Sequence, residues 1–132
     1  MPLQIELKPN EKMLIGGAVI QNGDHRCELM VLNDVPILRE KDIIAESEAD
    51  TPAKRIYLAV QLMYIDGERL AEYHQLYWGL VKDVVAAAPS ALSYVDEMSH
   101  CILDGRYYQA LKVASRLIQY EKELIDHVSE PA

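Results

Sequence analysis

The sequence predicts an α+β fold, in which an N-terminal antiparallel β-sheet is followed by a C-terminal helical bundle of about four helices. Two periodicities support this prediction. Up to about residue 44 apolar residues alternate with polar ones or form short runs between turns, whereas further along they recur three and four residues apart. Half of the 132 residues are hydrophobic, which is enough for a real core. We expect a boundary near residue 48, with a β-rich region over 1–48 and a helical bundle over 49–132.

Four or five short strands are predicted in the first region. The first strand has strict apolar–polar alternation, and the second ends at a glycine. Asn22-Gly23-Asp24 stands between two apolar runs, a strong signal of a β-hairpin. A sheet of so few strands is not stable alone. We therefore expect it to pack on the helices or on a second copy of itself. The predicted strands cover 3–8, 13–15, 18–20, 27–32 and 37–38.

The helices are predicted from their ends as well as from their periodicity. Thr51 can cap a helix N-terminus, and Pro52 suits the first helical position, where no intrahelical donor is required. Asp66-Gly67, Pro89-Ser90 and Asp104-Gly105 separate the later helices. Such short joints imply antiparallel neighbours in a bundle. The predicted helices cover 51–65, about 68–88, 92–103 and 106 to about 128.

The charge balance restricts which partners the chain can bind. The net charge is −8, and residues 1–48 contain five cations against nine acids. Because affinity for nucleic acid depends largely on cations that neutralise phosphates, any nucleic-acid site on this chain must be a small local patch. Cys27 and Cys101 are expected to be buried free thiols. The N-terminus does not resemble an export signal, and the uncharged stretches are shorter than the ~20 residues that span a bilayer, so we expect a cytoplasmic protein without a membrane segment.

Catalytic and metal-binding motifs are absent from the sequence. Glu97 and His100 have the Glu-x-x-His spacing of a di-iron bundle, but such a site needs a second copy of this pair. His25, His74 and His127 are scattered, and there is no Gly-rich phosphate loop or nucleophile elbow. We therefore predict that the protein is not an enzyme and carries no cofactor or metal.

Two blocks of the first region carry a resemblance to a known family. The block from Leu3 to Gly16 combines an alternating strand, an acid-bearing Pro-Asn turn and a short apolar strand, and the block from Pro36 to Ile43 contains Leu38-Arg39-Glu40. In this order they resemble the carbon-storage-regulator (CsrA-like) proteins, small β-rich dimers that bind messenger RNA leaders. With Asn22-Gly23-Asp24 and the segments 50–57 and 59–64, the whole chain resembles the FlbT family of flagellum-biosynthesis regulators of alphaproteobacteria.

This resemblance implies an RNA site on the N-terminal sheet. Lys8 corresponds to a basic position that closes the first strand of CsrA-like proteins, and Arg39 to the arginine of their last strand. An arginine on a strand edge can bind a phosphate or a base edge. The alternative is that Arg39 forms a solvated ion pair with Glu40, Asp42 or Glu6. The expected RNA-binding set is Ile5, Lys8, Lys12, Leu38, Arg39 and Lys41, in which Ile5 and Leu38 supply an apolar floor.

The chain also departs from the CsrA-like pattern. Those proteins have two consecutive basic residues where this chain has Leu7-Lys8, and glycine where Asn10 stands. Leu7 cannot supply the first of these two phosphate contacts. A similar sheet could therefore carry a changed binding mode.

The resemblance to FlbT implies a post-transcriptional regulator that associates with the leader of flagellin messenger RNA and lowers its translation or lifetime, although the effect within that family can be repression or activation. The competing hypothesis is an adaptor that binds a flagellar partner, a FlaF-like protein or flagellin, without direct RNA contact. The acidic charge favours the adaptor, and the Lys8 and Arg39 motifs favour RNA. Because open sheet edges need cover, we expect a homodimer through the N-terminal sheet.

Overall fold

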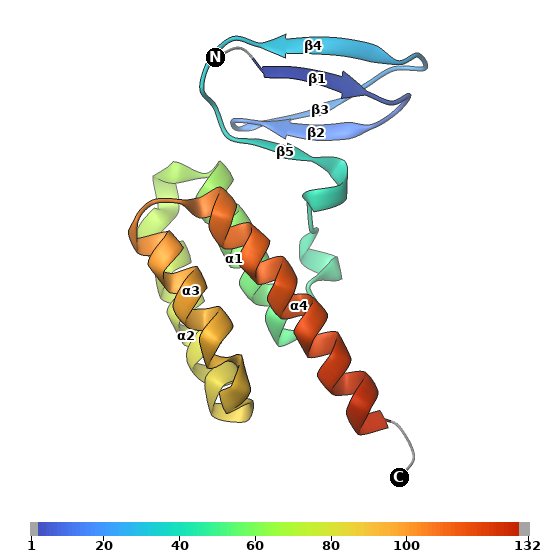
Figure 1. Ribbon diagram of the computed structural model, residues 1–132. Helices are drawn as coiled ribbons and strands as arrows, with labels where there is room; N and C mark the ends of the chain where they lie inside the picture. Colours follow the sequence, from blue (N-terminus) through green and yellow to red (C-terminus); the bar gives the residue numbers. More distant parts are fainter. Residues whose placement is uncertain (1–2, 130–132) are drawn as a thin grey trace. The chain divides into compact units, whose positions relative to one another are not determined.

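The structure is a computed structural model that describes residues 3–129, and it has the predicted α+β class, with antiparallel strands followed by four long helices (Figure 1). The chain divides into two compact units between Ile43 and Ile44, whereas the sequence placed the boundary near residue 48. The first unit contains β1 to β5, and the second contains α1 to α4.

The strands of the first unit form two small sheets instead of the single predicted sheet. In one sheet β1 (Leu3–Leu7) pairs with β4 (Cys27–Val31), and in the other β2 (Lys12–Ile15) lies between β3 (Ala18–Gln21) and β5 (Ile37–Arg39). All pairings are antiparallel. In Figure 1 the two sheets form two layers of this unit.

A shared apolar core joins the two sheets. Ile5 and Leu7 of β1 and Met13 of β2 are buried at its centre, so the alternating face of β1 packs on the second sheet. The partly buried residues packed around them are Ile15, Ile20, Cys27, Leu29, Val31 and Ile37. The period-two pattern therefore identified the inward face of β1 correctly at Ile5 and Leu7, but Leu3 at the strand end is 51% exposed.

The predicted hairpin at Asn22-Gly23-Asp24 is wrong, because β3 and β4 belong to different sheets. The two-residue hairpin loop is Gly16-Gly17, where Gly16 has a φ of 57° that glycine adopts without steric cost. Asn22 instead holds a corner between the sheets. Its amide nitrogen donates to the carbonyls of Lys8 and His25, both at 2.8 Å, and its amide oxygen accepts from the Gly23 N–H at 2.8 Å.

The helices of the second unit confirm the predicted pattern. They are α1 (Pro52–Ile65), α2 (Leu70–Ala87), α3 (Leu92–Leu103) and α4 (Tyr107–Ser129), joined by short turns and single 3₁₀ turns. The Thr51 hydroxyl accepts from the Lys54 N–H at 3.3 Å, as expected for an N-cap. Helix α1 packs against α2 and α4, and α3 packs against α4.

Buried polar contacts fix the helical unit at two places. The Gln61 side chain, only 4% exposed, accepts from the Ile44 N–H at 2.8 Å and donates to the Ile44 carbonyl at 3.0 Å, which ties the start of the unit to α1. Tyr77 of α2 and Ser99 of α3 share a buried hydrogen bond of 2.8 Å. Burial raises the pKa of Tyr77 to about 12, so its hydroxyl stays protonated. Both cysteines are free thiols, as predicted, but only Cys101 is buried, whereas Cys27 is partly exposed.

Candidate functional site

Three of the predicted RNA-binding residues lie around one hollow of the first unit. Lys8, Arg39 and Lys41 line it together with Pro9, Asn10, Glu11 and Glu40, and its volume is about 430 Å³. The turn after β1 forms one side, and the end of β5 with the 3₁₀ turn Glu40–Asp42 forms the other. The hollow therefore unites the two sequence blocks. Its three cations outnumber its two acids, although the unit contains seven acids and five cations.

The turn that carries Lys8 is fixed by its backbone and by the Glu11 side chain. The Lys8 N–H donates to Glu11 Oε1 at 2.9 Å, and the Glu11 N–H donates to the Lys8 carbonyl at 3.1 Å. Between them Asn10 has a φ of 63°, a left-handed conformation that asparagine adopts more readily than most residues. The backbone of Lys8 is thus held in place, while its side chain is exposed.

Arg39 forms an ion pair with Glu11, which is not one of the three acids predicted as its partners. Its guanidinium donates to both carboxylate oxygens of Glu11, with nitrogen–oxygen distances of 3.1–3.3 Å, and Nη2 also donates to the main-chain carbonyl of Glu6 at 2.8 Å. The Glu6 carboxylate pairs instead with Arg26 at 2.7 Å. Arg39 therefore links β5 to β1 and to the turn after it, which gives it a structural role in the free chain.

The Arg39 guanidinium keeps part of its binding capacity. Its side chain is 36% exposed, whereas that of Glu11 is 13% exposed. Of its five N–H donors, the two on Nη1 make no hydrogen bond within residues 3–129. An incoming phosphate oxygen could therefore bind at Nη1 without displacing Glu11, and could bind at two nitrogens only if Glu11 moved away.

The Glu11 carboxylate is stabilised in its charged form. The hydrogen bond from the Lys8 N–H is the largest effect that lowers its pKa below the ordinary value, and the hydrogen bond and charge of Arg39 lower it further. Partial burial acts in the opposite direction and is outweighed. Glu11 therefore stays ionised at neutral pH and neutralises one of the three cations of the hollow.

The lysines of the predicted set are exposed, and none of them forms a salt bridge within the described part of the chain. Lys8 and Lys41 line the hollow, so their ammonium groups are free to contact an anion there. Lys12 is exposed as well, at the start of β2, but it does not line the hollow. The structure thus brings Lys8, Arg39 and Lys41 together and leaves Lys12 outside.

The predicted apolar floor for RNA requires a correction. Ile5 is 5% exposed because it packs in the core between the two sheets. Leu38 is 3% exposed and pairs with Leu14, on the opposite face of its sheet from Met13. Ile5 is therefore covered within its own unit, so apolar contact with a base cannot come from this residue.

Comparison with known proteins identifies the family. Residues 3–125 match the family described as "Flagellar protein FlbT". The chain belongs to the FlbT family. A relative from Bradyrhizobium diazoefficiens, named "Probable flagellum biosynthesis repressor protein FlbT 1", is 46% identical over 94% of this chain and 85% of its own length. A Rhodopseudomonas palustris relative is 45% identical over 95% of this chain and 98% of its own length.

A third relative in the FlbT family is also named as a repressor of flagellum biosynthesis. The "Flagellum biosynthesis repressor protein FlbT" of Caulobacter vibrioides is 37% identical over 98% of this chain and 93% of its own length. These names describe repressors and not enzymes. No solved structure matches the chain.

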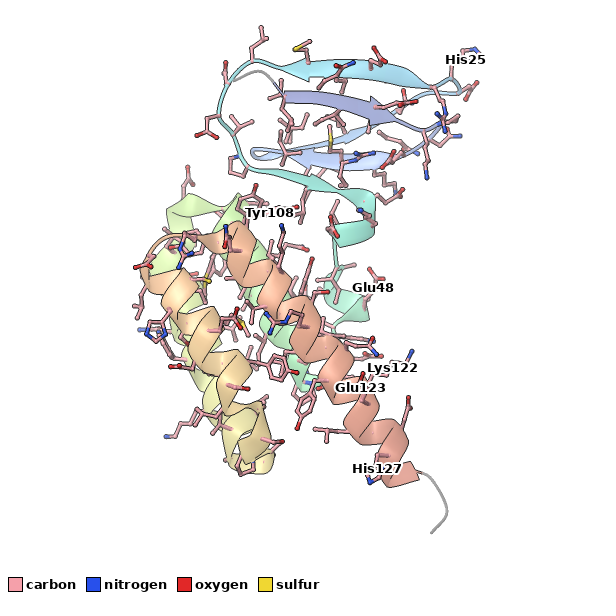
Figure 2. The ribbon with its side chains drawn as sticks, viewed as in Figure 1. His25, Glu48, Tyr108, Lys122, Glu123 and His127 are labelled. Atoms are coloured by element: carbon pink, nitrogen blue, oxygen red, sulfur yellow. The ribbon has the colours of Figure 1, made fainter. Side chains whose placement is uncertain are left out.

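Elsewhere in this FlbT-family chain Glu97 and His100, the pair with the spacing of metal ligands, have other partners. Glu97 pairs with Arg116 at 3.2 Å, and His100 Nδ1 lies 2.8 Å from the main-chain oxygen of Asp96. No group of three or more His, Cys, Asp or Glu side chains within residues 3–129 is placed to hold a metal ion. His25 lies in the loop between β3 and β4, and His127 near the end of α4, as Figure 2 shows. None of the described helices is both long and apolar enough to cross a membrane.

Two residues that fix the geometry around Lys8 and Arg39 were not among those predicted from the sequence. Glu11 positions Lys8 and binds Arg39, and Asn22 holds the Lys8 carbonyl from another strand connection. An acid three residues after Lys8 was a usable signal, because that spacing allows a side chain to close a turn. The long-range partners had no sequence signal, since Glu11 and Arg39 are 28 residues apart.

Proposed function

We propose that this chain is a post-transcriptional regulator of flagellin synthesis. In this proposal it binds the 5′ leader of flagellin messenger RNA in the cytoplasm and represses its translation or promotes its degradation. The names of its relatives, which describe flagellum biosynthesis repressors, support the regulatory part. The main structural support is the convergence of Lys8, Arg39 and Lys41 on one hollow of an otherwise acidic unit.

The chemistry of the hollow suits a short stretch of unpaired RNA. Two exposed ammonium groups and the free Nη1 of Arg39 can neutralise phosphates, while the two acids limit how many. Single-stranded loops are the usual targets of sequence-specific RNA recognition, because their base edges are accessible. Glu40 can accept hydrogen bonds from base amino groups, so this acid of the hollow can contribute to selectivity as well as to repulsion.

Binding of a flagellin leader RNA across a salt series tests the proposal. The variant K8A/K41A removes two exposed cations of the hollow and leaves the Arg39–Glu11 pair intact. We expect weaker binding and a salt slope lowered by about 0.7 for each phosphate contact that is lost. The matched control is K82A/K122A, which makes the same change in net charge at two exposed lysines of the helical unit. Equal binding by the two double variants would contradict the proposed site.

A homodimer through the N-terminal unit remains part of the proposal. The face of β1 that carries Ile5 and Leu7 is covered within the unit, so it cannot be the interface. Exposed apolar side chains elsewhere on this unit favour self-association: Val19 is 72% exposed, Met30 57% and Leu32 75%. The alternative function, an adaptor that binds a FlaF-like protein or flagellin without touching RNA, predicts no salt-sensitive leader binding by the purified chain.

A further inference from the structure

The helical unit contains an apolar groove that its own core does not fill. Its volume is about 450 Å³, and it lies between the start of α1, the end of α2, the following 3₁₀ turn Pro89–Ala91, and the second half of α4. Its lining is almost entirely apolar and includes Ala53, Val84, Ala87, Ala91, Leu117 and Leu124. Small residues on one side and branched residues on the other leave room for side chains of a partner.

The groove arises from the unequal lengths of the helices. Helix α4 has 23 residues, about 34 Å, whereas α1 has 14, about 21 Å, and α3 has 12, about 18 Å. Neighbouring helices therefore do not cover the apolar stripe of α4 along its full length. Ile125 on this part of α4 is 52% exposed. Figure 2 shows Lys122, Glu123 and His127 along the same part of the helix.

Specific contacts fix the positions of the helices that line the groove. Tyr120 of α4 donates its hydroxyl proton to Ser90, and its ring stacks on Tyr94 with centroids 5.1 Å apart. On the other side Glu121 of α4 accepts from the Ala53 N–H at the start of α1, at 2.9 Å. These contacts fix α4 against its neighbours on both sides. The groove is thus preformed, which lowers the entropic cost of binding.

The charges around the groove select a cationic partner. Asp83 and Glu121 are the acidic residues of its lining, and the Asp83 carboxylate has no hydrogen-bonding or ionic partner within residues 3–129. The last turn of α2, which forms one end, contains no basic residue to offset the negative end of its helix dipole. The helical unit has fourteen acids and eight cations in sequence, so a second copy would bring like charges together.

We propose that this groove binds a basic amphipathic helix of a partner protein. Apolar residues at i, i+3, i+4 and i+7 of that helix fill the groove, and lysine or arginine residues beside them contact Asp83, Glu121 and the end of α2. The site lies in a different unit from the RNA hollow and does not depend on it. The groove therefore gives the chain a second binding surface for a different class of partner.

Titration of the full-length chain with designed peptides tests this site. The probe is a helical peptide of about 15 residues with leucine at the i, i+3, i+4 and i+7 positions and lysine at the exposed positions. One comparison peptide has glutamate in place of lysine, and another has the same composition in an order without an apolar face. We expect one lysine peptide per chain, and binding at least about tenfold weaker for each comparison peptide.

Two variants with matched controls distinguish binding in the groove from nonspecific electrostatic binding of a basic peptide to an acidic protein. A87Y fills the groove, and A86Y places the same side chain at the neighbouring exposed position of α2 outside it. We expect A87Y to weaken binding at least about tenfold and A86Y to leave it unchanged. D83N should weaken binding of the lysine peptide more than E72Q, which removes an acid elsewhere on α2.

Three results would overturn the proposal. One is equal binding of the lysine peptide and the peptide without an apolar face, and another is equal binding by A87Y and A86Y. The third is a loss of self-association in A87Y but not in A86Y, measured by light scattering, which would identify a second copy as the occupant. K8A/K41A should bind the lysine peptide like the unmodified chain, so failure of the RNA site and failure of the groove are distinguishable.

Discussion

Replacement of Glu11 by glutamine should strengthen binding of the leader RNA and make it more sensitive to salt. In the structure Glu11 neutralises Arg39 through two carboxylate oxygens and also accepts from the Lys8 N–H. The amide oxygen of glutamine can still accept from Lys8, so the turn is kept, while Arg39 loses its counter-charge. The formal charge of the hollow then rises from +1 to +2, since three cations face only Glu40.

The size of the effect follows from counterion release. One additional phosphate contact on a single strand changes the slope of log affinity against log salt by about 0.7. Between about 50 and 200 mM salt, a fourfold change, the affinity of E11Q should therefore fall roughly 2.6-fold more than that of the unmodified chain. Fluorescence anisotropy with a labelled flagellin leader measures both slopes.

The matched control is E40Q, which raises the charge of the same hollow but leaves the Arg39–Glu11 pair in place. Its slope should change less than that of E11Q. Thermal unfolding of each variant establishes that the N-terminal unit is folded during the measurement. A folded E11Q protein with an unchanged or shallower slope would refute the reasoning, because Arg39 would then not be released towards RNA. Equal salt slopes for E11Q and E40Q would mean that the net charge of the hollow, and not the release of Arg39, causes the change in slope.

Two further predictions concern stability. Because the pKa of Glu11 is lowered in the folded chain, its carboxylate stabilises the fold above the ordinary value of 4.5, and this contribution is lost as the pH falls through the folded value. The difference in thermal stability between the unmodified chain and E11Q should therefore shrink below about pH 4.5, and a constant difference across this range would contradict the assignment. In the helical unit, Y77F leaves the buried Ser99 hydroxyl without its partner and should cost about 1–3 kcal/mol in the free energy of unfolding, measured by urea denaturation. The double variant Y77F/S99A should recover part of this loss, and additive losses from the two single changes would disprove the coupling.

The site was predictable where it depended on local sequence. The order of the two blocks indicated that Lys8 and Arg39 belong to one surface, and the structure places both at the same hollow with Lys41. The ion pair of Arg39 with Glu11 was not predictable, because Glu40 and Asp42 lie much closer to Arg39 in the sequence than Glu11 does. Which acid an arginine reaches depends on how strands are arranged, and that arrangement brought the turn after β1 beside the end of β5.

Local rules were sufficient for the helices. Thr51-Pro52, the apolar spacing of α1 and the turn at Gly105, whose φ is 74°, depend on contacts within a few residues. The sequence by itself therefore located all four helices closely, although α2 begins at Leu70 after a 3₁₀ turn and not at about residue 68. It also determined the family and the α+β class, because both rest on the order of elements along the chain.

Only the tertiary structure decided how the strands pair and which apolar residues remain exposed. The Asn22-Gly23 sequence is compatible with a β-hairpin or with a turn between two sheets. It forms the turn between sheets because β4 pairs with β1, and the Asn22 side chain stabilises this turn by its hydrogen bond to the Lys8 carbonyl. The alternation in β1 predicts which face of the strand is apolar, but it does not predict what packs against that face. From the sequence alone, Ile5 could equally have faced RNA. Strand pairing and the cover of a face depend on residues far apart in sequence, and the groove beside α4 likewise depends on where neighbouring helices stop.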